Sequence, residues 1–188
     1  MKKIFSVISA LALSLHISGT TFHVNNGGND NNNGLSLATA FLTLQKASNS
    51  VAAGDSVLVY NGTYTGFNHN GNASGTPGNP IVFYANGNNA WITQGSNIGD
   101  GINIENADWI EIHGFHVKVP NNTGIAGGEE GIRAVLADHI TIKNNYCDSC
   151  FRGIFTGYSD YITIENNTCT RSYGEHGIYV SNNSDYIT

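Results

Sequence analysis

Charged side chains are scarce in this sequence, and basic ones are the scarcest. Asp, Glu, Lys and Arg make up 12% of the 188 residues, and 8 basic side chains against 14 acidic ones give a formal net charge of −6. Nucleic acid is bound mainly through Lys and Arg, so this balance excludes it as an expected partner. A coiled-coil or long-helix protein is excluded too, because it would be rich in Ala, Glu, Lys and Leu.

Cysteine is almost as scarce, with only Cys147, Cys150 and Cys169 in the chain. An odd number of cysteines excludes a fully paired disulfide framework. The CxxC spacing at 147–150 has no second pair and no histidine at a matching distance, which argues against a zinc or redox motif.

Long apolar runs are missing after the first residues. At the start, Lys2 and Lys3 precede the apolar run 4–15, which is the pattern of a secretory signal peptide. We therefore predict a signal peptide over residues 1–19 and a domain over residues 20–188 that is secreted, periplasmic or displayed at the cell surface. No later stretch approaches the roughly 20 apolar residues of a transmembrane helix, so no membrane span is expected.

Turn-forming residues are what the sequence has in excess. It contains 23 Gly and 26 Asn, and both residue types tolerate the backbone conformations of tight turns. Many short strands joined by such turns are therefore expected, within one domain of this length.

The second half of the chain repeats itself. A Gly-Ile pair recurs at intervals of 22 to 30 residues, and each pair is followed by an Asp, an aromatic residue or His, and an Ile. The Gly-Ile pairs begin at Gly101, Gly131, Gly153 and Gly177, and the second units begin at Asp108, Asp138, Asp160 and Asp185. Short alternating runs at this period are typical of a β-solenoid. We predict an all-β, right-handed parallel β-helix with three short strands per coil and regular coils over about residues 100–188.

Residues one period apart should stack on adjacent coils about 4.8 Å apart. This predicts that three pairs of isoleucines point inward: Ile110/Ile112, Ile140/Ile142 and Ile162/Ile164. The asparagine pairs 144–145 and 166–167 should bond coil to coil in a turn. Cys147 should stack on Cys169 as a small core residue, and Cys150 should be free.

The ends of the solenoid need covering. Apolar residues at helical spacing over 39–51 predict an N-terminal capping helix within a cap of about residues 36–53. The sequence stops inside a coil, at residues 185–188, so we expect further C-terminal coils and a cap to be missing from it, and the full-length protein to be a monomer.

The phrases AGDSVLVYNGTYTGF (53–67) and GTPGNPIVFYANG (75–87), followed by the Asp-x-Ile-x-Ile coils, resemble secreted parallel β-helix proteins. The N-terminal half is similar to polysaccharide lyases of families 6 and 9, which include alginate, chondroitin and pectate lyases. The resemblance covers about residues 21–188. It implies a substrate groove along the first strand of each coil and the loops before it, here 120–130, 150–152 and 170–176.

Two registers of residues fall on that groove. Asn103, Arg133, Phe155 and Tyr179 follow the inward Ile of the Gly-Ile pairs, so we predict an outward column for substrate binding. Asp100, Glu130, Arg152 and His176 lie just before the pairs. Aromatic faces suit sugars, and Arg pairs well with a uronate carboxylate.

Elimination from a uronic acid needs neutralisation of the developing enolate and a group that takes the proton. We predict Ca²⁺ as cofactor, with Asp100, Glu129 and Glu130 as its ligands, and Arg152, Arg133 and His176 as catalytic residues. An Arg base is chemically demanding because its pKa lies above 12. The lyase families' own catalytic set matches no position here.

The leading functional hypothesis is an exported lyase, or its N-terminal portion, that cleaves an acidic polysaccharide by calcium-assisted β-elimination. The alternative is a non-catalytic β-helix that binds glycans or serves as a surface module. A glycoside hydrolase using Asp100 and Glu130 comes third. A further outward column, Trp109, His139, Tyr161 and Tyr186, either binds glycan or packs beneath a loop.

Overall fold

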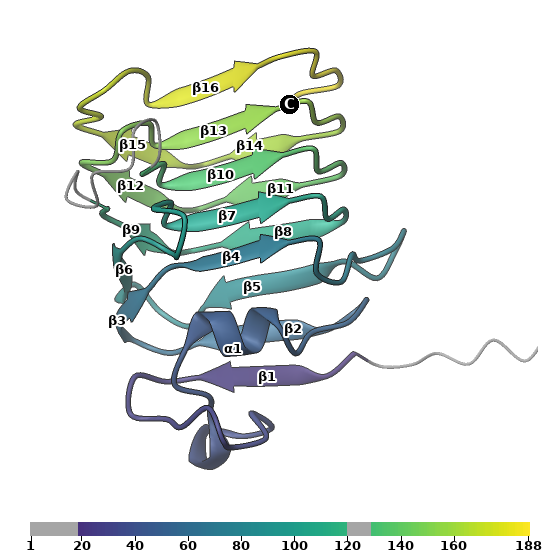
Figure 1. Ribbon diagram of the computed structural model, residues 1–188, viewed down its shortest axis with the longest axis vertical. Coiled ribbons are helices and arrows are strands. Elements are labelled where there is room, and N and C mark those ends of the chain that lie inside the picture. The colour runs from purple at the N-terminus through teal and green to yellow at the C-terminus, as the bar shows by residue number, and fades with distance from the viewer. Residues whose placement is uncertain (1–18, 120–128) are drawn as a thin grey trace, which may run out of the picture.

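Strands from successive coils lie one above another and build three parallel sheets (Figure 1). The computed structural model describes residues 19–119 and 129–188, and these residues form a right-handed parallel β-helix, as predicted. The predicted signal peptide and most of the 120–130 loop lie outside the described residues. No helix within the described ranges is long and apolar enough to span a membrane.

Three sheets form the faces of the solenoid, and each is named here for reference. Sheet A contains, in spatial order, β1 (Thr21–Val24), β2 (Ser56–Val59), β5 (Ile81–Ala85), β8 (Ile110–His113), β11 (Thr141–Lys143) and β14 (Thr163–Glu165). Sheet B contains β3 (Gly62–Thr65), β6 (Ala90–Gln94), β9 (His116–Val117), β12 (Tyr146–Asp148) and β15 (Thr168–Thr170). Sheet C contains β4 (Phe67–Asn70), β7 (Ile102–Glu105), β10 (Ile132–Val135), β13 (Ile154–Gly157) and β16 (Ile178–Ser181).

Each regular coil passes through sheet C, then sheet A, then sheet B, as in β7, β8 and β9. Residues one sequence period apart are direct partners across the sheets. Ile132 pairs with Ile102 and Ile154, and Ile142 pairs with Ile112 and Ile164. The predicted coil register is therefore confirmed on all the strands that carry the repeat.

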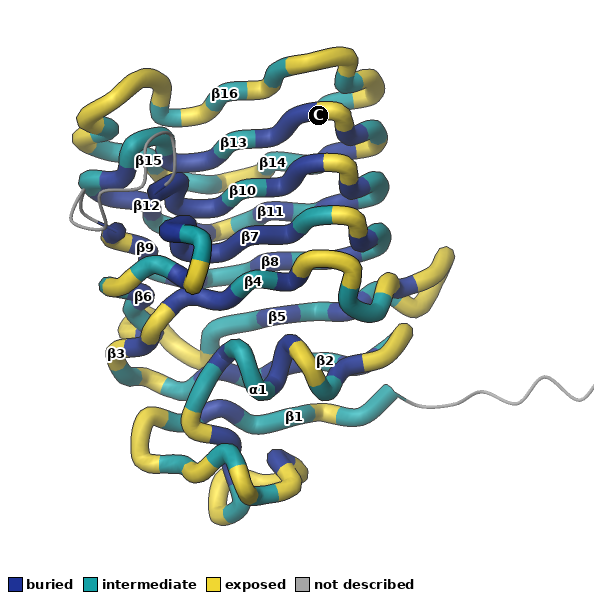
Figure 2. Tube along the Cα trace, viewed as in Figure 1, coloured by how far each residue is buried: buried dark blue, intermediate teal, exposed yellow. Residues whose placement is uncertain are grey.

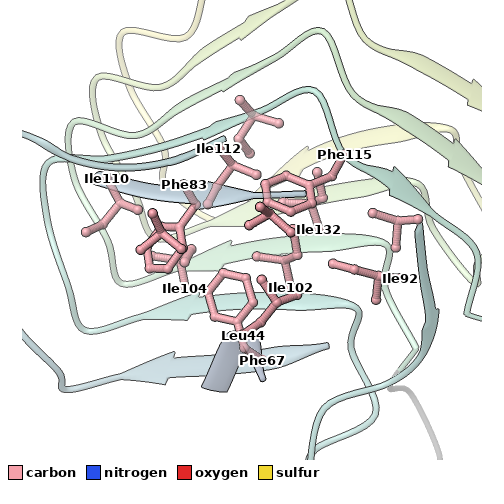
Figure 3. Packing of buried hydrophobic residues seen from close by; sticks show 14 of the residues in the cluster. Leu44, Phe67, Phe83, Ile92, Ile102, Ile104, Ile110, Ile112, Phe115 and Ile132 are labelled. Carbon is pink, nitrogen blue, oxygen red and sulfur yellow. The ribbon is translucent and has the colours of Figure 1, made fainter. Parts of the chain in front are cut away.

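The core is a continuous ladder of Ile, Val and Phe side chains inside the three sheets (Figure 3). Period-two alternation sends every second strand residue inward, and the tube in Figure 2 shows the resulting buried stretches along the central strands. Aromatic rings fill the wider lower coils, where Phe67 stacks on Phe83 with ring centroids 4.7 Å apart.

Polar ladders hold the coils together at their turns. Asn145 Nδ2 donates to Asn167 Oδ1 at 3.0 Å, and Asn144 and Asn166 adopt positive φ angles of 58° and 54°. At the turn before sheet A, Asp138 N donates to Asp108 Oδ1 at 2.8 Å, and Asp160 N repeats this contact with Asp138 Oδ1. The predicted asparagine turn is confirmed. The aspartate of the repeat makes a similar coil-to-coil contact at the turn before sheet A.

The cysteines behave as core residues. Cys147 pairs in register with Val117 and Cys169, and all three cysteines are free thiols. Cys150 is free as expected, and it is buried, which raises the pKa of its thiol to about 12.

The helix of the N-terminal cap is shorter than predicted. Only Leu44–Ser48 forms an α-helix, α1, preceded by a 3₁₀ turn, η1, over Leu37–Thr39. Phe41 instead continues as extended chain, with an isolated parallel bridge to Val24. Thr43 then caps the helix by accepting from Lys46 N at 3.1 Å. α1 lies against β4 and β1 at the lower end of sheet C (Figure 1), so the capping role is retained over five residues.

Candidate functional site

The outer face of sheet C carries a column of side chains from consecutive coils. Asn68, Asn103, Arg133, Phe155 and Tyr179 are register partners on β4, β7, β10, β13 and β16. We call them the sheet C column. Because the register is exact over five strands, residues 111 positions apart in the chain share one surface.

The lower half of the column is a closed polar network. Arg133 Nη1 donates to Asn103 Oδ1 at 2.6 Å and to Glu105 Oε2 at 2.7 Å. Asn103 Nδ2 donates to Asn68 Oδ1 at 2.8 Å. These neighbours leave Asn103 with no exposed surface, so the prediction that Asn103 faces substrate is wrong. Its amide orients Arg133 instead.

The upper half of the column is an aromatic cluster around one guanidinium group. The Arg152 guanidinium carbon lies 4.2 Å from the ring centroid of Phe155 and 5.5 Å from that of Tyr179. The His176 ring meets Tyr179 edge-on with centroids 5.0 Å apart. The structure thus brings together four of the predicted residues. Arg152 and Phe155 flank the Gly-Ile pair at 153–154, and His176 and Tyr179 flank the pair at 177–178.

The register before the Gly-Ile pairs is also stacked coil upon coil. Gly131 N donates to the Arg152 carbonyl, and Gly153 N to the His176 carbonyl. Arg152 reaches down to Glu130, with its Nε donating to Oε1 at 2.9 Å, and up to Glu175, with its Nη1 donating to Oε2 at 3.3 Å. Flanked by two carboxylates and by the rings of Phe151, Phe155 and Tyr179, Arg152 is a fixed positive charge.

The three predicted calcium ligands are buried, each at 3% exposure or less. Asp100 Oδ1 accepts from the backbone N–H groups of Glu129 and Glu130, at 3.1 and 3.0 Å. Glu129 Oε2 accepts from the Tyr173 hydroxyl at 2.5 Å. Burial raises the pKa of Asp100 to about 6 and also raises the pKa of Glu130, although Arg152 opposes the second shift.

This donor set does not fit a metal centre. Within residues 19–119 and 129–188, no group of three or more His, Cys, Asp or Glu side chains is placed to hold a metal ion. Asp100 Oδ1 is occupied by two backbone N–H groups and Glu130 Oε1 by Arg152, and among the described residues Glu130 Oε2 is buried without a hydrogen-bond partner. Both side chains also lie beneath the surface, which does not suit the pair of carboxylates of a glycoside hydrolase.

The side chains of the cluster that suit proton transfer are its uppermost ones. Arg152 and Arg133 are each paired with carboxylates, and a guanidinium group keeps its proton at neutral pH, so neither suits the role of a base. His176 is exposed and Tyr179 is half-buried. An exposed imidazole beside a phenol hydroxyl has the groups that general acid–base catalysis uses.

A hollow lined by amides lies at the foot of the sheet C column. It has a volume of about 380 Å³, and its lining residues come from α1, β3, β4 and nearby loops: Gln45, Asn49, Thr65, Gly66, Asn68, Asn72 and Asn97. No sequence pattern predicted this hollow, since β4 lacks the Gly-Ile pair and α1 is not part of a repeat. Glu105 and Glu175 were also missed, because the repeat does not show which side chains of neighbouring coils Arg133 and Arg152 reach.

Comparison with known proteins supports the fold and leaves the chemistry open. No family model and no curated protein matches the sequence. Among solved structures, a rhamnogalacturonan lyase superposes with a TM-score of 0.58 at 20% identity, over 88% of this chain and 51% of the other. The GH136 lacto-N-biosidase from Eubacterium ramulus gives 0.61 at 14% identity, over 87% and 41%. Pectate lyase Pel9A gives 0.53 at 17% identity, over 86% and 55%.

The shared feature is the parallel β-helix. At 14–20% identity these likenesses show the fold alone. The present chain spans between 41% and 55% of the length of these structures.

Proposed function

We propose that this chain is an exported polysaccharide lyase, or the N-terminal part of one, which binds an acidic polysaccharide along the sheet C column and cleaves it by β-elimination. The observation that carries the proposal is the cluster in which Arg152, Phe155, Tyr179 and His176 meet on one face. It combines a fixed positive charge, a ring platform and a titratable group within one sugar's reach.

In this proposal the groups have separate tasks. Phe155 supports a sugar ring, and Arg152 and Arg133 attract the uronate carboxylate. His176 takes the proton from C5, the electron pair forms the C4–C5 double bond, and the C4–O bond breaks. The Tyr179 hydroxyl then gives a proton to the departing oxygen. Calcium, if bound, would supply further neutralisation of the carboxylate, but no step here depends on it.

The test is direct assay of the purified chain on polygalacturonate, alginate, chondroitin and rhamnogalacturonan. We expect the ultraviolet absorbance of the unsaturated product to rise on at least one polymer. His176→Ala should lower that rate by about 100-fold, since general base catalysis contributes about that much. His23→Ala, on β1 and away from sheet C, is the matched control and should keep the rate.

Assays with added Ca²⁺ and with a chelator test the predicted cofactor separately. Loss of activity in chelator, restored by Ca²⁺, would support calcium use.

The rival proposal is a non-catalytic glycan-binding β-helix. It is favoured by one observation, that Arg133 and Arg152 are already neutralised by Glu105, Glu130 and Glu175. Retention of a polymer on the protein with no unsaturated product from any of the four would establish this reading and exclude the lyase.

A further inference from the structure

A second repeated surface lies at the turns between sheet C and sheet A, on the right in Figure 1. Trp109, His139, Tyr161 and Tyr186 follow one another there, and their rings stack face to face. Successive ring centroids are 3.9, 4.6 and 4.6 Å apart, with interplanar angles of 12°, 5° and 1°. We call these four residues the aromatic column.

The aromatic column is held in an unfavourable backbone conformation. All four residues have φ between 56° and 58°. That left-handed region costs most residues about 1–2 kcal/mol, and it is rare for bulky side chains. Retention of the conformation at four successive coils points to a use for aromatic side chains at this corner.

The aromatic column forms one wall of a cleft of about 510 Å³. The floor consists of residues two positions after each ring: Glu111, Thr141 and Thr163 of sheet A, and Thr188, whose backbone bonds to Ile162 and Ile164. Gly78 and Pro80 close the lower end. The cleft therefore repeats one motif, a ring followed by a polar side chain, at every coil.

The cleft offers ring edges and polar atoms, because each ring covers the face of its neighbour. Ring edges carry the positive end of the aromatic quadrupole and attract oxygen atoms. Within the described part of the chain, the polar ring atoms of Trp109, His139, Tyr161 and Tyr186 have no hydrogen-bond partner, nor do the hydroxyls of Thr141 and Thr163. Glu111 on the floor faces His113, with Oε2 and Nε2 3.0 Å apart, so the unpartnered groups of the cleft are the ring atoms and the threonine hydroxyls.

We infer that this cleft is a second binding site for a linear polysaccharide, which lies along the solenoid axis and is held by ring edges and hydroxyls. A polymer suits the site because the surface repeats about every 4.8 Å, a total of about 14 Å over the four rings. Sugar oxygens match the unpartnered donors, and the acidic protein surface disfavours nucleic acid. The site is independent of the sheet C column and would anchor the same or another glycan.

The test uses Trp91→Phe, which leaves Trp109 as the sole tryptophan and places the reporter in the cleft. Its fluorescence is titrated with polygalacturonate and with a neutral β-glucan, after circular dichroism has confirmed the fold. We expect saturable quenching with at least one polymer. In this background Tyr161→Phe plus Tyr186→Phe keeps the stack and removes two hydroxyls, and should weaken binding about tenfold.

Tyr158→Phe is the matched control, since it removes an exposed hydroxyl outside the cleft. It should leave the titration unchanged. No fluorescence response to either polymer would overturn the inference, as would equal affinities for the double variant and the control. A response that follows protein concentration without any polymer would assign the cleft to contact between two copies and would also overturn it.

Failure here is separable from failure of the lyase proposal. The product assay reports only the chemistry at sheet C, whereas the Trp109 signal reports only occupancy of the cleft.

Discussion

At the scale of single residues, two adjacent asparagines have different structural roles. Asn144 is exposed and supplies a left-handed turn residue, with φ at 58°. Asn145 is buried, and its side chain accepts from Phe115 N at 2.9 Å and donates to the Ile112 carbonyl at 3.0 Å. Asn145 therefore satisfies backbone groups of the coil below that have no access to water.

Asn145→Ala should cost about 3 kcal/mol of unfolding free energy, because two buried backbone groups lose their partners at about 1–3 kcal/mol each. Asn144→Ala, the neighbouring control, should cost only about 1 kcal/mol for the left-handed backbone. Urea denaturation of both variants measures the difference. Equal costs would mean that the Asn145 bonds contribute nothing beyond the turn.

Asp100 makes the stability of the fold depend on pH. Its folded pKa is raised from 3.8 to about 6, chiefly by burial. Between these values the unfolded chain loses the proton while the folded chain keeps it, so the folded state binds more protons. Stability should therefore fall as pH rises from about 4 to about 6, and stay level above that.

Asp100→Asn isolates this effect, since the amide oxygen still accepts from both backbone N–H groups but does not titrate. The stability of the wild type relative to Asp100→Asn should decline by about 3 kcal/mol across that window, at about 1.4 kcal/mol per pKa unit. Denaturation curves at pH 4, 5, 6 and 7 give the result. A difference that grows with pH would contradict the burial argument.

The type of a residue predicted its place in a turn or on a sheet face better than it predicted which side chains it contacts. The left-handed turn at Asn144 follows from the known tolerance of asparagine, whereas the same backbone at Trp109 and Tyr161 does not follow from any local preference. Likewise, the alternation placed Asn103 on the outer face, but its burial depends on the length of Arg133 and the position of Glu105. Such contacts come from neighbouring coils, whose side chains the alternation does not describe.

At the scale of elements, the strands that carry the repeat were predictable, and so was the presence of a capping helix, but its length was not. Gly-Ile and Asp-x-Ile recur, so each coil confirms the assignment of the next one. Residues 36–53 occur once, and their helical spacing competes with extended pairing of Phe41 beside Val24. The result is a five-residue helix held by tertiary contacts, since so short a helix is not stable alone.

Leu44 is the residue through which α1 covers the core, and it is fully buried. Leu44→Ala should destabilise the protein by about 3 kcal/mol, as large-to-small core substitutions do. Leu42→Ala, two residues earlier and 42% exposed, should cost less than about 0.5 kcal/mol. Thermal or urea unfolding of the pair tests whether α1 is a structural cap. Similar small costs for both would show that the core end needs no cover there.

At the scale of the whole molecule, the two proposed polymer-binding surfaces favour the binding of a polysaccharide, whereas the net charge opposes the approach of an acidic one. Both proposed sites run along the solenoid axis, which is how a repeating protein presents an extended surface. The chain nevertheless carries a net charge of −6, and Arg133 and Arg152 already face Glu105 and Glu130. The composition predicted the sign of this charge, and only the structure shows that the positive groups on sheet C are locally neutralised.

An acidic polysaccharide should therefore approach against a long-range repulsion that salt removes. Raising the ionic strength from about 10 mM to about 150 mM shortens the screening length from about 30 Å to about 8 Å. The association rate with polygalacturonate should rise about threefold, since steering by net charge acts mainly on that rate. The rate with a neutral glycan, measured in the same surface-binding experiment, should stay constant. A fall in the polygalacturonate rate with salt would show instead that Arg133 and Arg152 leave their carboxylate partners and attract the polymer directly.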